Sequence, residues 1–315
     1  MSLNLAVDSG GTKVRAVLYD EFFNPIKECV VGSMRPESTS APLVEKHIRE
    51  LVDKLEIKGK TISTLVGIYE DALYDELCRV TTVENAILIE EDKLGFLSAG
   101  IFGDGYLAIA GTGSTLFCSL NGEVKRAGGY GSLIADEGSG YWIAREAFIA
   151  AIQDEEGRGK KTRLRELIAQ KLGKTIEDFP SAVLSIYDQM DINPVTYIAS
   201  FAPLVTQAAN AHDEIALNIL KNAGRLLGEQ LASLVKAGSP KDLPIALCGS
   251  VWKSHGILFS EFCDVIRKEG MTGEIKRTVF EPVIGAILYH FKSINNDIIT
   301  SDFEAFRKKY NSFLL

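Results

Sequence analysis

The chain has 315 residues, of which 46% are hydrophobic and 24% charged, and its net charge is −8 at pH 7. This length is sufficient for two modest domains with buried cores, and the composition is that of an ordinary soluble globular protein. An acidic chain without a basic stripe is not expected to bind nucleic acid, because phosphate backbones are bound by clustered lysine and arginine. A small anion carried with a metal ion is still compatible with this charge, since local geometry can override net charge.

The cysteines and the N-terminus indicate the cellular setting. Five cysteines lie far apart without a Cys-x-x-Cys pair, which favours reduced thiols in a cytoplasmic protein over a zinc, iron–sulfur or disulfide framework. No charged-then-apolar leader follows Met1 and no long apolar run occurs, so we expect neither secretion nor a membrane partner. The four histidines have no metal-ligand spacing, and we assign them no role.

Short apolar strands alternate with amphipathic helical stretches along most of the chain, which is typical of an α/β fold. Two segments repeat each other without a gap: LAVDSGGTKVRAVLYDE (residues 5–21) and LAIAGTGSTLFCSLNGE (residues 107–123). Each contains an apolar strand, a Gly/Thr/Ser turn, a second apolar strand and a polar turn. We therefore predict a glycine-rich β-hairpin that occurs twice through duplication.

The turns of both hairpins have the composition of phosphate-binding loops. Glycines let backbone N–H groups converge on an anion, and Thr12, Thr112 and Ser114 add hydroxyl donors. Asp8 of the first hairpin is replaced by Ala110 in the second. A single carboxylate suits a Mg²⁺ shell, whereas a second one would repel phosphate, so Asp8 is the candidate metal ligand.

Three acids follow an apolar strand in AILIEEDKLGFL, residues 86–97. Glu90, Glu91 and Asp92 form either a solvated turn or a group with one catalytic carboxylate. If the strand continues through them, its alternation places Glu90 and Asp92 on one face and Glu91 on the other.

The usual nucleotide-binding signatures are absent. The GKT triplets at Gly59–Thr61 and Gly173–Thr175 lack the glycine that a P-loop has five residues earlier. GTGSTL, which begins at Gly111, lacks the third glycine of a dinucleotide fingerprint, so a Rossmann site is a weak alternative.

A glycine-rich segment precedes a predicted helix in AGGYGSLIADEGSGYWIAREAF, residues 127–148. Ser139 is a candidate helix cap. Asp136 and Glu137 are either acids of the helix start or acceptors for sugar hydroxyls in a glycine-lined cleft that includes Gly129.

The second half of the chain contains further helices and one more strand. Residues 153–179 are highly charged and are predicted to form a solvated helical excursion, and residues 194–236 show helical spacing. PIALCGSVWKS (residues 244–254) predicts a buried strand that ends at Gly249 and Ser250, which is either a ligand site or a simple turn. EPVIGAILYHF is expected to be a core helix.

Four of these motifs resemble those of the N-acetylglucosamine kinase-like proteins, a group of the BadF/BadG/BcrA/BcrD ATPase family in the actin–hexokinase–heat-shock ATPase superfamily. VDSGGTKVRAVLYD, AIAGTGS, GGYGSLIADEGSGYWI and LCGSVWKS are similar to the first phosphate, second phosphate, substrate-loop and adenosine motifs, in family order across residues 3–290. The resemblance implies an α/β fold of two duplicated ribonuclease H-like (actin-like ATPase) domains around a nucleotide cleft. We expect these domains at residues 1–116, joined by C-terminal helix from about 282 to 315, and at residues 117–281.

The resemblance also implies an ATP-dependent kinase that uses Mg²⁺, forms a homodimer and phosphorylates an amino sugar, usually at the 6-hydroxyl. N-acetylglucosamine, glucosamine and N-acetylmuramate are the candidate acceptors. Asp92 precedes Gly111 by nineteen residues, the family spacing of the catalytic aspartate. By the same resemblance, the acceptor meets Gly129, Asp136 and Glu137. The residues expected to bind ATP are Gly10, Gly11, Thr12, Lys13, Gly111, Thr112, Gly113, Ser114, Gly249 and Ser250.

Two loops on the acceptor side depart from the family pattern. GSMRPESTS has Arg35 near the position of a sugar-binding asparagine, and VGIYEDALYDEL replaces a glycine-rich loop. Arg35 is either a surface cation or, as we hypothesise, the partner of an acidic substituent such as the lactyl carboxylate of N-acetylmuramate. The alternatives to a kinase are a reductase-activating ATPase, for which no suitable cysteine pair exists, and a non-catalytic sugar sensor.

Overall fold

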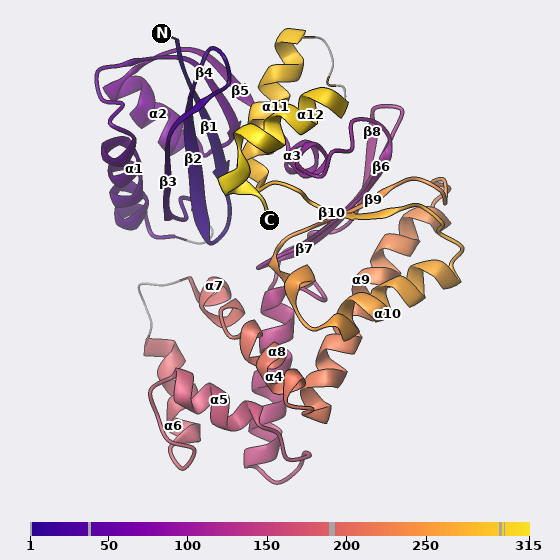
Figure 1. The fold of residues 1–315 in the computed structure, drawn as a ribbon. Helices are drawn as coiled ribbons and strands as arrows, with labels where there is room; N and C mark the ends of the chain where they lie inside the picture. Colours follow the sequence, from indigo (N-terminus) through magenta and orange to yellow (C-terminus); the bar gives the residue numbers. More distant parts are fainter. Residues whose placement is uncertain (1, 37–38, 189–192, 296–297, 299) are drawn as a thin grey trace. The chain divides into compact units, whose positions relative to one another are not determined.

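The computed structural model describes residues 2–36, 39–188, 193–295, 298 and 300–315 (Figure 1). The chain forms two compact units, the first from Met1–Gly103 with Lys276–Leu315 and the second from Asp104–Ile275. We expected the boundary at residues 116 and 117, inside the second hairpin. The observed boundary lies before that hairpin, because the whole hairpin pairs within the sheet of the second unit.

The first unit contains a five-stranded mixed sheet in the order β3-β2-β1-β4-β5. Its strands are β1 (Leu3–Ser9), β2 (Lys13–Asp20), β3 (Pro25–Gly32), β4 (Thr61–Ile68) and β5 (Thr82–Leu88). β1 is antiparallel to β2 and parallel to β4, and β4 is parallel to β5. The ends of β1, β4 and β5 therefore lie along one side, which we call the carboxyl edge of the first sheet.

Helices cover both faces of this sheet, as the strand pattern requires. The elements are α1 (Ala41–Leu55), α2 (Asp71–Val80), α3 (Glu91–Ser98), α11 (Pro282–Asn295), α12 (Thr300–Lys309) and the 3₁₀ turn η3 (Asn311–Phe313). Leu5 and Val7 of β1 pack in the core with α1 and α2, whereas Ala6 between them packs with α3 and α11. This alternation follows from the two-residue period of a strand, and it confirms that the EPVIGAILYHF segment is a core helix.

The other sheet, which belongs to the second unit except for Lys276 and Arg277, has the order β10-β9-β6-β7-β8. Its strands are β6 (Gly105–Ala110), β7 (Ser114–Leu120), β8 (Glu123–Gly128), β9 (Ile245–Cys248) and β10 (Ile275–Arg277). β6 is antiparallel to β7 and parallel to β9, as β1 is to β2 and β4. Read in reverse, this order repeats that of the first sheet, so the predicted duplicated hairpins occupy equivalent places in two equivalent sheets.

The helices of the second unit agree with the predicted pattern in most places. They are α4 (Gly140–Glu155), α5 (Leu164–Lys171), α6 (Phe179–Leu184), η1 (Ser185–Asp188), α7 (Pro194–Ala199), α8 (Ala202–Asn210), α9 (Glu214–Lys236), η2 (Ser250–Lys253) and α10 (Gly256–Lys268). The helical region 194–236 is confirmed as three helices, and Asp213 caps the last by accepting from the Ala216 N–H at 2.9 Å. The charged segment 153–179 is not wholly solvated, because Asp154 is buried and paired with Lys161 at 2.8 Å.

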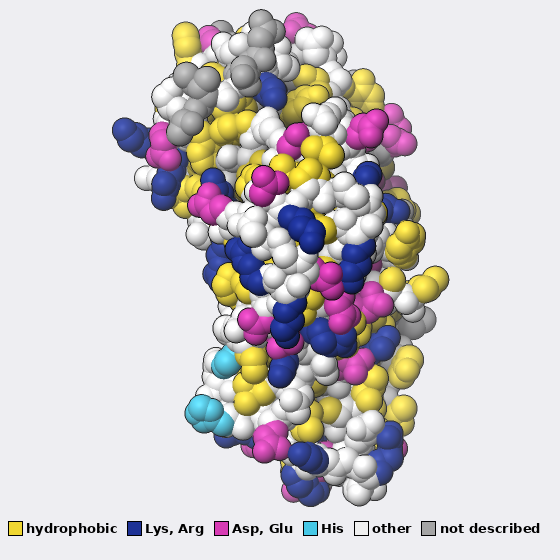
Figure 2. Space-filling view, turned by 90° about the vertical axis from the view of Figure 1, so that its right-hand side faces the viewer, with side chains coloured by type: hydrophobic (Ala, Val, Ile, Leu, Met, Phe, Trp, Pro, Cys, Tyr) yellow, Lys and Arg dark blue, Asp and Glu magenta, His cyan; other side chains and the backbone are white. Residues whose placement is uncertain are grey.

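Acidic and basic side chains are interspersed on the face of the molecule drawn in Figure 2. Within the described residues, no helix is long and apolar enough to cross a membrane. The five cysteines are free thiols.

A buried polar pair joins α11 to the first sheet. The Tyr19 hydroxyl lies 2.6 Å from Nδ1 of His290, both side chains are buried, and the Phe23 ring packs against both of their rings. Burial raises the pKa of Tyr19 and lowers the pKa of His290. Tyr19 therefore keeps its proton and the imidazole of His290 is neutral, so the pair is joined by a hydrogen bond between two uncharged groups.

This pair predicts a loss of stability in acid. The unfolded chain takes up a proton at His290 at a higher pH than the folded chain does, so folding opposes protonation and the free energy of unfolding falls below about pH 6.5. We expect urea unfolding at pH 7.5 and 5.5 to show a smaller acid-induced loss for His290→Phe than for the unsubstituted chain. His212→Asn, at an exposed histidine, is the control and should keep the original loss. An unchanged loss in His290→Phe would contradict the assignment.

Candidate functional site

The carboxyl edge of the first sheet surrounds Asp8 with charge. Asp8 is the next-to-last residue of β1 and is half-buried. Burial and then the negative charge of Glu91 raise the pKa of Asp8 to about 6, while Arg35 and Lys13 act against the shift. Ionised Asp8 is therefore incompletely compensated, and a cation bound there would stabilise it.

The turn between β1 and β2 contains the phosphate-binding residues predicted for this unit. The Gly10 N–H donates to the Lys13 carbonyl at 2.9 Å and closes the turn, while Thr12 and Lys13 are exposed. A Cβ added to Gly11 would have no atom of a residue beyond its chain neighbours within 4 Å. The structure thus brings these four residues together directly beside Asp8.

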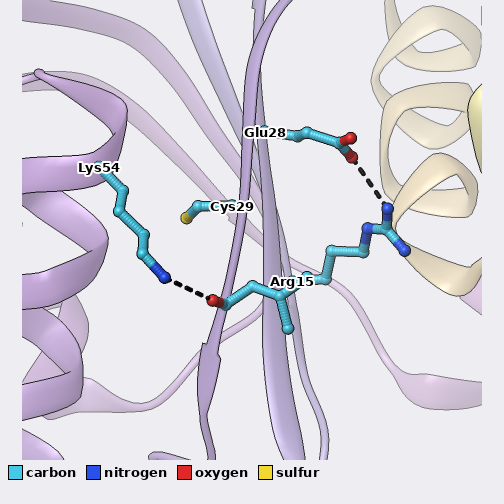
Figure 3. A pocket seen from close by; sticks show the side chains of 5 residues that line it. Arg15, Glu28, Cys29 and Lys54 are labelled. Atoms are coloured by element: carbon cyan, nitrogen blue, oxygen red, sulfur yellow. Dashed lines mark hydrogen bonds and ion pairs between the residues drawn. The ribbon is translucent and has the colours of Figure 1, made fainter.

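Arg15 lies opposite Asp8 but forms its ion pairs with other residues, which the sequence did not indicate. The two residues are directly opposite in the β1–β2 register, so their side chains leave the same face of the sheet. The Arg15 guanidinium nevertheless binds Glu28 at 2.9 Å, as Figure 3 shows, pairs with Glu281, and lies 4.8 Å from the centre of the Phe313 ring. Arg15 therefore forms ion pairs with the two glutamates and does not neutralise Asp8.

Arg35 is anchored to the end of β1. Its Nε donates to the Ser9 carbonyl at 3.0 Å and lies 3.8 Å from Oε1 of Glu70. The Ser33 hydroxyl donates to the Gly10 carbonyl at 3.0 Å, which joins the same loop to the turn. The loop 33–35 is therefore part of the carboxyl edge. Sequence reasoning placed Arg35 near the acceptor but did not identify Glu70, because their contact spans 35 residues of chain.

The acids 90–92 are not the end of a strand, which corrects our expectation. β5 ends at Leu88 and α3 begins at Glu91, so the strand alternation assumed for these side chains does not apply. Asp92 is 5% exposed, whereas Glu90 and Glu91 are exposed. Burial raises the pKa of Asp92. The three acids are therefore distinct, and Asp92, which the family resemblance led us to expect as the catalytic residue, is the one that is buried.

The second unit holds its glycine-rich turn against the start of α4. The Gly140 N–H donates to the Gly111 carbonyl at 2.7 Å, and the Tyr141 N–H donates to the Thr112 carbonyl at 3.1 Å. The Gly111 N–H donates to the Gly113 carbonyl at 2.9 Å. Ser139 caps α4 as predicted, by accepting from the Trp142 N–H at 3.2 Å. These contacts fix the turn that corresponds to Gly10–Lys13.

Asp136 ties the substrate-loop motif to this turn. Its Oδ1 accepts from the Gly131 N–H at 3.2 Å and its Oδ2 accepts from the Ser132 hydroxyl at 3.1 Å. It is 6% exposed and has a positive φ of 58°, and a Cβ on Gly113 would lie only 2.6 Å from its Oδ2. Burial raises the pKa of Asp136. Its carboxylate is thus held within its own loop.

The other predicted residues of this loop lie close to the same turn. The Glu137 carbonyl accepts from the Ser114 hydroxyl at 3.1 Å, and the Gly129 N–H donates to the Ser114 carbonyl at 3.1 Å. Gln230, which the sequence did not single out, also donates to the Glu137 carbonyl, at 3.2 Å. The loop and the turn therefore form one hydrogen-bonded assembly.

Gly249 and Ser250 lie at the carboxyl end of β9, beside the end of β6. Gly249 has a φ of 107°, and a Cβ there would lie 2.3 Å from the Ala110 carbonyl oxygen. Trp252 donates from Nε1 to the Ala108 carbonyl at 3.0 Å and holds the following 3₁₀ turn against β6. The second unit therefore brings its two predicted nucleotide-binding segments together.

We predict that Gly249→Ala destabilises the protein by about 2 kcal/mol or more, because the new methyl group meets backbone and the positive φ is strained for alanine. The melting temperature should fall correspondingly. Gly256→Ala is a suitable control, since nothing lies within 4 Å of its added Cβ. Equal melting temperatures for the two variants would show that the Gly249 backbone is not constrained as described.

Comparison with known proteins identifies the family of this chain. It is 26% identical over 280 residues to the N-acetylmuramic acid/N-acetylglucosamine kinase of Clostridium acetobutylicum, covering 83% of this chain and 89% of that one. It is 30% identical to the N-acetyl-D-glucosamine kinase of Dictyostelium discoideum over 211 residues, 65% of each chain. A Chromobacterium violaceum structure assigned as an N-acetylglucosamine kinase has the same fold, with a TM-score of 0.65, 21% identity, and coverage of 91% of this chain and 98% of that one.

A ROK family glucokinase from Streptomyces griseus shares the fold with a TM-score of 0.54 and 16% identity, over 91% of this chain and 99% of that one. The two mixed sheets with their helices are thus the duplicated actin-like ATPase fold of sugar kinases. A family model matches residues 5–290, which include every glycine-rich turn described above. The chain belongs to the BadF/BadG/BcrA/BcrD ATPase family.

Proposed function

We propose that this protein is an ATP-dependent kinase that phosphorylates an amino sugar, with N-acetylglucosamine, glucosamine and N-acetylmuramate as candidate acceptors and the 6-hydroxyl as the position. The names of the two kinases from Clostridium acetobutylicum and Dictyostelium discoideum support an amino-sugar acceptor. The observation that carries the proposal is the buried Asp92, with its raised pKa, at the carboxyl edge of the first sheet. We further propose that the enzyme acts in the cytoplasm as a homodimer.

Asp92 is the proposed general base. A carboxylate accepts a hydroxyl proton more effectively when its pKa is raised toward the working pH, and burial has this effect on Asp92. Exposed Glu90 and Glu91 lack that environment. In the proposed reaction Asp92 accepts the proton of the sugar hydroxyl as the hydroxyl oxygen bonds to the γ-phosphorus of ATP. The bond from that phosphorus to the β,γ-bridging oxygen breaks, and ADP leaves with the bridging oxygen.

The glycine-rich turns are the proposed phosphate-binding elements. Phosphoryl transfer depends mainly on positioning and charge stabilisation, which N–H and hydroxyl donors provide. In the first unit the proposed residues are 10–13, and in the second unit they are 111–114. Gly249 and Ser250 are proposed to contact the adenosine, since they directly follow the end of β9 and lie beside the second turn.

Asp8 is the proposed Mg²⁺ ligand. Its incompletely compensated carboxylate fits a hard cation. Among the residues that the structure describes, no three His, Cys, Asp or Glu side chains form a metal-binding group. A single carboxylate agrees with the preference of Mg²⁺ for few protein ligands together with water and substrate phosphates. When bound, the ion would neutralise charge on the transferred phosphoryl group.

The proposed acceptor residues are Gly129, Asp136, Glu137 and Arg35. Asp136 is engaged by Gly131 and Ser132, so its contribution includes the shape of the loop as well as any contact with a sugar. Arg35 is proposed to face a substituent of the acceptor, since it lies on the loop next to Ser9 and the β1–β2 turn.

We expect ATP and Mg²⁺ to give sugar-dependent ADP release with at least one of N-acetylglucosamine, glucosamine and N-acetylmuramate, and much less with glucose. Phosphorus NMR of the product should locate the phosphate at the 6-position. Slow ADP release that no sugar accelerates would reject the kinase and favour a sensor or activator.

Replacing the base should separate binding from chemistry. We expect Asp92→Asn to lower kcat by about 10²–10⁴-fold, the usual contribution of a general base, with the Kd for ATP retained. Glu91→Gln is the matched change at the neighbouring exposed acid and should be mild. A severe loss in Glu91→Gln with a mild one in Asp92→Asn would reverse the assignment.

A further inference from the structure

The loop between β4 and α2 carries an acid that the proposed function does not use. Glu70 directly precedes α2 and lies two residues after the end of β4. Its Oε1 accepts from the Ser9 hydroxyl at 3.4 Å and lies 3.8 Å from Nε of Arg35, which itself donates to the Ser9 carbonyl at 3.0 Å. These three residues form a connected group, the Ser9–Arg35–Glu70 cluster.

The cluster lies directly beside the predicted metal ligand. Ser9 is fully buried and follows Asp8 in β1. The side chains of Arg35 and Glu70 are 35% and 26% exposed, so a small molecule can approach both while neither is fully solvated. Partial burial strengthens the electrostatic effect of each charge relative to bulk water.

An acidic acceptor that approaches Arg35 also approaches Glu70. Glu70 offsets part of the positive charge of Arg35 that would attract a carboxylate. Electrostatic mismatch of this kind is a common way in which binding sites disfavour a ligand. A neutral N-acetyl sugar carries no charge and does not meet this penalty.

We propose that Glu70 is a specificity-determining residue that disfavours acceptor sugars bearing a carboxylate relative to neutral amino sugars, through its contact with Arg35. The proposal rests on the proposed function, in which Arg35 faces the acceptor. Glu70 acts on the acceptor by its charge and takes no part in phosphoryl transfer.

Glu70→Gln tests this role because it removes the charge and keeps the size of the side chain. We would measure calorimetric Kd values and kcat/KM for N-acetylmuramate and N-acetylglucosamine. The preference for N-acetylmuramate over N-acetylglucosamine should rise about tenfold, with little change for the neutral sugar. Asp75→Asn is the matched control at an exposed acid of α2 and should leave the preference unchanged. Glu70→Asp should retain the original preference.

The double variant Arg35→Ala/Glu70→Gln tests whether the effect runs through Arg35. Compared with Arg35→Ala alone, the double variant should show little of the tenfold gain in preference for N-acetylmuramate over N-acetylglucosamine. An unchanged preference in Glu70→Gln, an equal gain without Arg35, or failure of both sugars to bind the folded protein would overturn the inference. Melting temperatures establish that each variant is folded. If the binding preference shifts as expected but no phosphate is transferred, the kinase proposal fails and the inference about Glu70 stands.

Discussion

The parallel pairing of β1 with β4, and of β4 with β5, is the constraint on which the candidate site of the first unit depends. Parallel strands end at the same edge of a sheet, where α/β proteins commonly bind ligands. The pairing therefore places Asp8, Glu70 and Asp92 on one edge, although Asp8 lies near the end of β1 and the other two come after β4 and β5. If β4 were antiparallel to β1, Glu70 would lie at the opposite edge and would not reach Ser9.

The charge balance at this edge depends on which carboxylates the arginine side chains pair with. Arg15 lies opposite Asp8 but forms ion pairs with Glu28 (Figure 3) and with Glu281, so it does not neutralise its cross-strand neighbour. Arg35 offsets the charge of Asp8 in part while also lying beside Glu70. Burial, followed by the charge of Glu91, therefore leaves Asp8 with a raised pKa, and a bound cation would stabilise its ionised form. An edge with this charge distribution suits a ligand that brings both phosphate and a metal ion.

The second unit repeats the topology with different chemistry. Ala110 occupies the place of Asp8, and the turn that follows is supported by the start of α4 and by Asp136. The close approach of Gly113 to Asp136 and of Gly249 to Ala110 leaves no room for a side chain at either glycine. Duplication thus supplied two similar turns, of which one retains a carboxylate and the other is built into a loop with a buried acid.

The amino-acid sequence by itself determined the local features. The two hairpins, the Ser139 cap and the core helix α11 follow from residue patterns that span at most about twenty positions. The choice of Asp92 came from the resemblance to the family, through its spacing to Gly111. Propensity and periodicity are short-range properties, so such features can be predicted without knowledge of the fold.

Only the tertiary structure decided the features that depend on distant contacts. The sequence pattern of the three acids 90–92 could not distinguish a strand from a helix. The packing of Leu94 and Leu97 with α11 favours the helix, in which Asp92 is buried. The pairings of Arg35 with Glu70 and of Arg15 with Glu281 join residues that no local pattern connects. The unit boundary likewise depends on which sheet the second hairpin joins, because backbone pairing between strands far apart in the chain leaves no local signal in either strand.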